Sequence, residues 1–188
     1  MDDREIRWRA VEVAYRDHAD DVYRVALAIL RDPDTAVDVT HDTFARAFDR
    51  WEQYDSARPL RAWLHGIVSH AALDALRRRR VRAHALQTSG RIRETDIAGR
   101  LEADPALHVT ETDAIDGALA DLKPDARAAL VLRHYYGYDY AEIARFLRTS
   151  PGNVGSVLSR AHATLRVRLA ADSTRSTTDL PAPRRAIR

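Results

Sequence analysis

The feature that most constrains the fold of this chain is a pair of helix-start signals on either side of a short turn near the carboxyl end. In the stretch YDYAEIARFLRTSPGNVGSVLSRAHATLRVRL, Asp139 followed three positions later by Glu142 has the pattern of a capping box, which starts a helix. Ser150 stands at the cap position of a second helix, whose first residue is Pro151. Two helices joined by so short a connection predict a helix-turn-helix, which commonly places its second helix in the major groove of DNA.

The second helix of this motif has an apolar side and a polar side. Val154 and Leu158 stand one helical turn apart and are expected to face inward. Gly152, Gly155 and Val157 occupy positions where basic side chains would strengthen the phosphate contacts that dominate DNA affinity. A lone helix of this kind is expected to bind weakly, and a helical hairpin that binds no DNA is the alternative. The residues left for base edges and phosphates are Asn153, Ser156, Ser159 and Arg160.

The remainder of the chain also has helical periodicity, and no segment shows the alternation of a strand. A first helix is expected from about Ile6 to Leu30, and a second begins at Pro33, directly after the capping residue Asp32. Together with the motif above, this pattern predicts an all-α fold. The helix that begins at Pro33 carries an apolar stripe that we expect to face the core, formed by Val37, Phe44, Phe48 and Trp51.

A third helix, expected to begin at Pro59, has two distinct faces. Leucine, isoleucine and valine residues form one side, which we expect to be buried. The other side combines a large aromatic ring, a glycine and basic groups, a composition that suits stacking on a nucleic acid. This second face consists of Trp63, Gly66, His70 and Arg77. The alternative is that Trp63 completes the core and His70 lies at the surface.

Charge is divided into blocks along the chain. Residues 58–82 carry seven arginines and one acidic residue, whereas residues 83–117 carry seven acidic residues and three arginines. Residues 118–169 are basic again, with eight basic and four acidic residues. Two basic blocks separated by an acidic spacer indicate two contacts with a polyanion, although arginines that only solvate helix surfaces are the alternative.

These changes in pattern divide the chain into four parts. We expect a helical domain at 1–82, an acidic flexible linker at 83–113, a helix-turn-helix domain at 114–170 and a disordered tail at 171–188. In the second domain, helices are expected at about 114–121, 124–136, 140–147 and 151–169.

Several classes of protein are disfavoured by what the sequence lacks. There is no cysteine, no apolar run of about 20 residues and no signal-peptide core at the charged amino terminus. Histidines are scattered and form no His-x-x-x-His or Glu-paired motif, which disfavours a metalloenzyme. We therefore expect a cytoplasmic protein that is not an enzyme. No catalytic residue, metal, cofactor, small-molecule substrate or membrane insertion is expected.

Three segments in order resemble one family, the extracytoplasmic-function (ECF) group of bacterial RNA polymerase σ factors. DVTHDTFARAF resembles the acidic helix of the family, and RPLRAWLHGIVSHAALDALRRRR resembles the helix that follows it. LKPDARAALVLRHYYGYDYAEIARFLRTSPGNVGSVLSRAHATL resembles the domain that binds the −35 promoter element. Together the matches extend from about Ala14 to Leu169. The resemblance implies a subunit that directs core polymerase to promoters and promotes their melting.

The resemblance also implies partners and roles for particular residues. Asp38, His41 and Asp42 match positions that dock on the clamp helices of the largest polymerase subunit, where acidic charge speeds and orients docking. Tyr54 matches an aromatic residue that helps to capture a flipped base of the −10 element, and Trp63 matches a position at the upstream edge of the melted segment. An anti-σ factor is left open as a further partner.

The implied DNA-binding residues form two groups. Those for the single-stranded −10 element are Tyr54, Arg58, Arg61, Trp63, His70, Arg77 and Arg78. Those for the −35 element are Ser150, Asn153, Ser156, Ser159 and Arg160. The acidic linker would lie in the RNA-exit channel.

Some residues depart from the family pattern. His41-Asp42 stands where Gln-Glu is common, and His70 where Asn is frequent. Gly155, Val157 and His162 stand where basic residues are common, so weak or differently specified −35 contact is expected. The competing hypothesis is a stand-alone helix-turn-helix regulator that binds a symmetric operator. The arginine-rich third helix argues against it, because a sensor domain has no need of four consecutive arginines.

Overall fold

The structure is a computed structural model that describes residues 2–88, 117 and 119–178. In this part of the chain every regular element is a helix, which confirms the all-α fold. None of the described helices is long and apolar enough to cross a membrane. Most of the expected linker lies outside the described residues. The elements are α1 (Asp3–Leu30), α2 (Pro33–Asp49), η1 (Trp51–Gln53), α3 (Leu60–Thr88), α6 (Pro124–Leu130), η2 (Val131–Tyr135), α7 (Tyr140–Leu147) and α8 (Pro151–Thr178).

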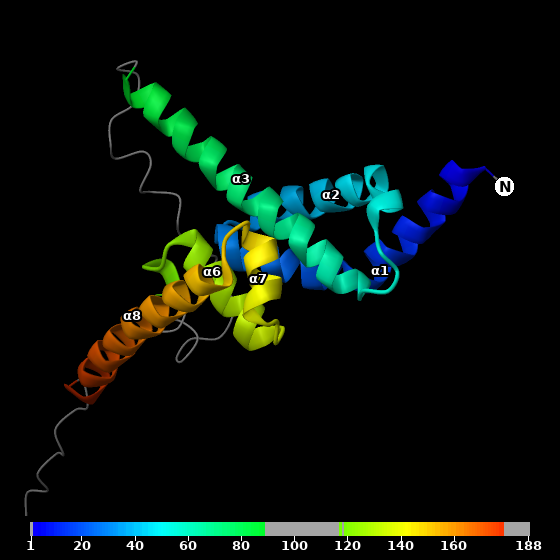
Figure 1. The fold of residues 1–188 in the computed structure, drawn as a ribbon. Coiled ribbons are helices and arrows are strands. Elements are labelled where there is room, and N and C mark those ends of the chain that lie inside the picture. The colour runs from blue at the N-terminus through cyan, green and yellow to red at the C-terminus, as the bar shows by residue number, and fades with distance from the viewer. Residues whose placement is uncertain (1, 89–116, 118, 179–188) are drawn as a thin grey trace, which may run out of the picture.

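Helices α1, α2 and α3 pack on one another and form an amino-terminal unit (Figure 1). The start of α2 is as expected, because the Asp32 side chain accepts a hydrogen bond from the Thr35 backbone at 3.1 Å and Pro33 is the first helical residue. The buried stripe of α2 differs from the expected one. Val37 is 43% exposed, whereas small residues beside Phe44 let α2 approach its neighbours closely. The stripe that is buried in the structure consists of Ala36, Val39, Thr40, Thr43, Phe44 and Ala47.

Helices α6, α7 and α8, with the π-helical turn η2, form a carboxy-terminal unit. The capping box of Asp139 and Glu142 is present, with reciprocal hydrogen bonds of 2.7 and 2.9 Å. The turn between α7 and α8 places Arg148 in the left-handed region with φ of 51°. Helix α8 continues to Thr178, so residues 171–178, expected to belong to a disordered tail, are helical.

The two units pack directly against each other. The buried Arg127 guanidinium donates to the Ile29 carbonyl of α1 at 2.7 Å and to the Leu122 carbonyl at 2.8 Å. Tyr136 donates its hydroxyl hydrogen to the Asp21 carbonyl at 3.1 Å. Because these bonds satisfy buried carbonyls from both units, they fix how the units are oriented.

Candidate nucleic-acid and polymerase-binding surfaces

The polar side of α8 is presented to solvent. Its residues bond mainly within their own turn: Asn153 donates its backbone N–H to Ser150 Oγ at 3.2 Å and its side-chain amide to Thr149 Oγ1 at 2.8 Å. Arg160 donates to the Ser156 carbonyl at 3.2 Å. These bonds hold the side chains close to the helix surface. The five residues expected to contact the −35 element, which are Ser150, Asn153, Ser156, Ser159 and Arg160, are all exposed.

The lack of positive charge at the tip of α8 does not result from a lack of space. A Cβ atom added at Gly152 would have no neighbour within 4 Å. One added at Gly155 would meet the Tyr140 ring at 3.5 Å, an ordinary van der Waals contact. The weak electrostatic character of this helix is therefore a property of its sequence, and larger side chains are compatible with its backbone.

An aromatic corner stands at the amino-terminal end of α3. The Tyr54 and Trp63 rings have centroids 5.2 Å apart, and Trp51 lies edge-on to Trp63 at 5.9 Å. The Tyr54 hydroxyl donates to the Arg58 carbonyl at 2.8 Å, which fixes the loop before α3. All three rings are partly exposed. The sequence pattern had assigned Trp51 only to the core, although its distance of three positions from Tyr54 was a signal for the corner.

The structure separates the residues that had been predicted to share one face of α3. Trp63 lies at the aromatic corner, and Arg77 and Arg78 are exposed farther along the helix. Helix α7 covers the part between them: a Cβ added at Gly66 would meet the Phe146 ring at 3.3 Å. His70 is half-buried there, and burial together with the nearby Arg148 guanidinium lowers its pKa. In this arrangement α7 covers part of Gly66 and His70, and both residues are only partly exposed.

His65 lies at the centre of the contact between the two units. Its side chain is fully buried, with Nδ1 3.0 Å from the Tyr138 hydroxyl and its ring edge-on to Tyr136 at 4.3 Å. Burial, followed by the charges of Arg61 and His18, lowers its pKa to about 3. The sequence pattern did not distinguish His65 from the other scattered histidines. The sequence signal for its burial was its position directly after Leu64, which is also buried.

The residues predicted to meet the polymerase lie together on one exposed side of α2. Asp38, His41 and Asp42 are all exposed, and Asp42 forms an ion pair with Arg46 at 3.0 Å. The His41 ring stacks on Tyr15 of α1, with centroids 6.3 Å apart and an interplanar angle of 21°. This stacking joins the acidic side of α2 to the neighbouring surface of α1.

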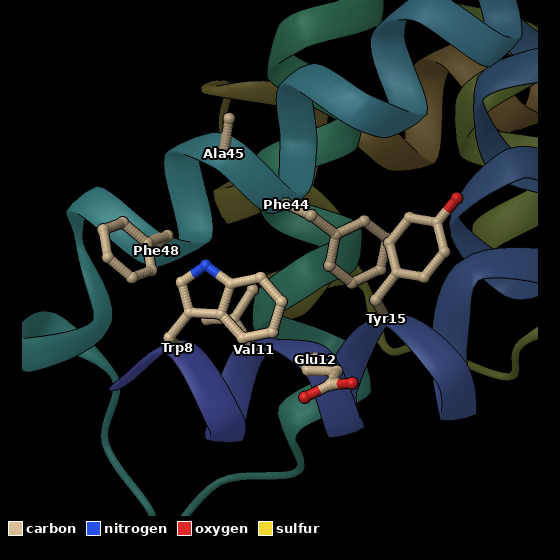
Figure 2. Close-up of a pocket in the computed structure, with 7 residues that line it drawn as sticks. All are labelled: Trp8, Val11, Glu12, Tyr15, Phe44, Ala45 and Phe48. Atoms are coloured by element: carbon tan, nitrogen blue, oxygen red, sulfur yellow. The ribbon is translucent and has the colours of Figure 1, made fainter. Parts of the chain in front are cut away.

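An apolar groove follows on that neighbouring surface, between α1 and α2 (Figure 2). Its volume is about 350 Å³, and the Trp8 side chain on its rim is 59% exposed. The sequence pattern did not identify this groove, although Trp8, Val11 and Tyr15 recur at helical spacing. Seven residues line it: Trp8, Val11, Glu12, Tyr15, Phe44, Ala45 and Phe48.

Comparisons with known families match both units. The family described as Sigma-70 region 2 matches residues 14–82, and Sigma-70, region 4 matches residues 112–165. The ECF RNA polymerase sigma factor SigL of Mycobacterium tuberculosis is 33% identical over 82% of this chain and 86% of its own length. The corresponding SigE of Mycolicibacterium smegmatis is 35% identical, and the match spans 84% of this chain and 61% of that relative.

Solved structures give the same fold. The sigma factor RpoE of Bartonella quintana, in complex with the anti-sigma factor NepR, matches with a TM-score of 0.68 and 22% identity, covering 86% of this chain and 97% of that one. CnrH, in complex with the cytosolic domain of CnrY, matches with a TM-score of 0.59 and 26% identity over 88% and 90% of the two chains. The fold and both regions define a transcription initiation factor. The chain belongs to the ECF group of RNA polymerase sigma factors.

Proposed function

We propose that this chain directs core RNA polymerase to specific promoters in the cytoplasm and promotes their melting through base capture, without covalent chemistry of its own. The observation that supports the proposal is that one chain matches both sigma regions and that each region has an exposed surface suited to DNA. One surface is the polar side of α8, and the other is the aromatic corner with the exposed arginines around it. The stand-alone regulator has no support from the comparisons.

The polymerase contact is proposed to lie on α2. Asp38, His41 and Asp42 form an exposed polar ridge that is suited to a basic partner surface. The groove beside it supplies the apolar area that a charged ridge lacks, and an exposed Trp8 on its rim has the character of an interface anchor. We assign to the clamp helices of the largest polymerase subunit a contact that covers both the ridge and the groove.

The −10 element is proposed to bind as single strand at the aromatic corner. Tyr54 and Trp63 offer ring faces, and base–aromatic stacking contributes about 1–3 kcal/mol per base. Extrusion of a base costs a few kcal/mol, so stacking offsets part of that penalty and neighbouring contacts must supply the rest. Exposed arginines near the start of α3 and farther along it are placed to meet phosphates, and they are Arg58, Arg61, Arg77 and Arg78.

The −35 element is proposed to meet α8 through Ser150, Asn153, Ser156, Ser159 and Arg160. Only one of these side chains is positively charged, so this contact is weak when it acts alone. A common scaffold that holds both DNA-contacting surfaces strengthens the binding, because bivalent attachment raises overall affinity by about 10² to 10⁴ without any new contact. The polymerase is that scaffold in this proposal.

The packing of α7 on α3 adds a condition to the proposal. Gly66 and His70 belong to the face expected to meet the upstream edge of the melted DNA, and α7 covers part of both. We propose that polymerase binding separates α7 from α3 and so exposes this face. An anti-σ factor is a further proposed partner, one that would hold the chain away from polymerase. Its support is the similarity of the fold to RpoE bound to NepR.

A gel-shift assay with and without core polymerase tests the proposed function. The purified chain alone should bind duplex promoter DNA negligibly, and the same chain with core polymerase should give a specific complex. Tight, salt-resistant binding by the chain alone would instead identify a stand-alone regulator. Failure to associate with core polymerase would refute the sigma role directly.

A further inference from the structure

Two histidines from different elements of the carboxy-terminal unit face each other. His134 lies on the π-helical turn η2 and His162 on α8, 28 positions apart in the sequence. Their Nε2 atoms are 2.8 Å apart, and their ring centroids are separated by 5.0 Å. Both side chains are exposed, so their nitrogens are within reach of ions in solution.

Facing Nε2 atoms can share either a proton or a metal ion. In the neutral pair only one ring can donate a hydrogen to the other, which uses the lone pair of the second ring. A divalent transition-metal ion uses both lone pairs, with metal–nitrogen distances of about 2.0–2.1 Å. Two ligands of a tetrahedral ion at such distances lie about 3.3 Å apart, so the rings need to separate by only about 0.5 Å. Exposed side chains accommodate a movement of this size by small rotations.

Packing and hydrogen bonding hold the backbone around the two histidines in place. His162 follows the buried Ala161, and Leu158 one turn earlier is also buried, so this part of α8 is fixed by packing. His134 is held by a helical turn in which the Tyr136 N–H bonds to the Val131 carbonyl at 3.3 Å. This wider turn, a form frequently found at functional sites, continues directly from α6 and carries His134 toward α8.

We propose that His134 and His162 together bind one divalent transition-metal ion of the kind that imidazole prefers, with Zn²⁺ as the probe. No cluster of three or more metal-ligating side chains occurs among the described residues. Two protein ligands therefore hold the ion, and the remaining positions belong to water or to a ligand from outside the chain. The sequence had predicted no metal site, because the two histidines are not neighbours in the sequence.

A bound ion would change the electrostatics of the DNA-reading helix. It adds two positive charges beside α8, whose tip contains Gly152, Gly155 and Val157 instead of basic residues. Its open positions accept oxygen ligands, including the phosphate oxygens of DNA. The ion-loaded chain therefore binds duplex DNA more tightly than the ion-free chain. This consequence for DNA rests on the proposed function, whereas ion binding itself does not.

Calorimetric titration of the tag-free full-length chain with Zn²⁺, after treatment with a chelator, tests the site. One saturable site is expected for the wild type. Loss of a residue that only supports a metal ligand costs about 10–100-fold in affinity, so His134→Gln and His162→Gln should each weaken binding by at least about 10-fold. His84→Gln removes an exposed histidine elsewhere and should leave binding unchanged. Circular dichroism checks that each variant is folded.

Two results of the titration would overturn the site: no saturable binding by the wild type, or unchanged binding in the His134→Gln, His162→Gln double variant. The DNA consequence has a separate readout, the fluorescence anisotropy of a labelled duplex. Zn²⁺ should increase the affinity of the wild type for the duplex and leave that of His162→Gln unaffected. Saturable Zn²⁺ binding without that increase would retain the site and refute its effect on DNA.

Discussion

Acidification should weaken the contact between the two units, because His65 has to remain uncharged inside it. The His65 ring is fully buried between Tyr136 and Tyr138, and burial is the main cause that lowers its pKa from 6.5 to about 3. In the unfolded chain the same ring takes up a proton near pH 6.5, while in the folded chain it does not. The stabilising contribution of the neutral ring is therefore complete above pH 6.5 and decreases as the pH falls toward 3.

The size of this effect follows from the two pKa values. Each pH unit below the unfolded-state pKa destabilises the fold by about 1.4 kcal/mol until the folded-state pKa is reached. At pH 5.0, about 1.5 units below 6.5, the loss is about 2 kcal/mol relative to neutral pH. Since typical domains are stable by only about 5–15 kcal/mol, this loss is large enough to measure.

Urea unfolding at pH 7.5 and pH 5.0 provides the measurement, with wild type compared with His65→Gln. The glutamine amide can accept a hydrogen bond from Tyr138 but does not titrate. Between the two pH values the wild type should lose about 2 kcal/mol more unfolding free energy than the variant. Other titrating groups, including His70, are common to both proteins and cancel in this comparison. An equal loss in both proteins would show that His65 takes up its proton without penalty, and the reasoning from burial would be wrong.

Three further substitutions test the proposed surfaces. Tyr54→Ala should reduce promoter opening, measured by permanganate reactivity, more than it reduces pull-down of core polymerase; equal loss of both would refute base capture by Tyr54. Trp8→Ala should weaken core polymerase binding by about 2 kcal/mol, the scale of an interface anchor, while the control Val167→Ala, at another exposed apolar residue, changes it little. Gly152→Arg should steepen the salt dependence of duplex binding by about 0.9 per added phosphate contact. Gly117→Arg, at another open glycine, is its control, and identical slopes for the two variants would contradict the assigned reading side of α8.

Local signals in the sequence were sufficient to locate the starts of the helices. Asp32 with Pro33 starts α2, and the capping box at Asp139 starts α7, because caps depend on residues within one turn of each other. The end of α8 was placed too early. Its continuation to Thr178 is compatible with the sequence, which has no proline or glycine between Leu169 and that residue.

Contacts between distant segments could not be predicted in this way. Helical periodicity assigned Gly66 to an open face of α3, but it contains no information that Phe146 would pack against that glycine. The facing nitrogens of His134 and His162 are a similar case, because η2 and α8 bring them together only in the folded carboxy-terminal unit. Of the predicted −10 residues, His70 is the one whose role requires an arrangement in which α7 has moved away from α3.

Two DNA-binding surfaces that are individually weak have to be held by a common scaffold in this account. Run-off transcription with core polymerase on genomic fragments, followed by mapping of the start sites, tests this claim most directly. The account predicts discrete start sites that appear only when the chain is added and that share sequence elements near −10 and −35. Transcripts that are the same with and without the chain would contradict it.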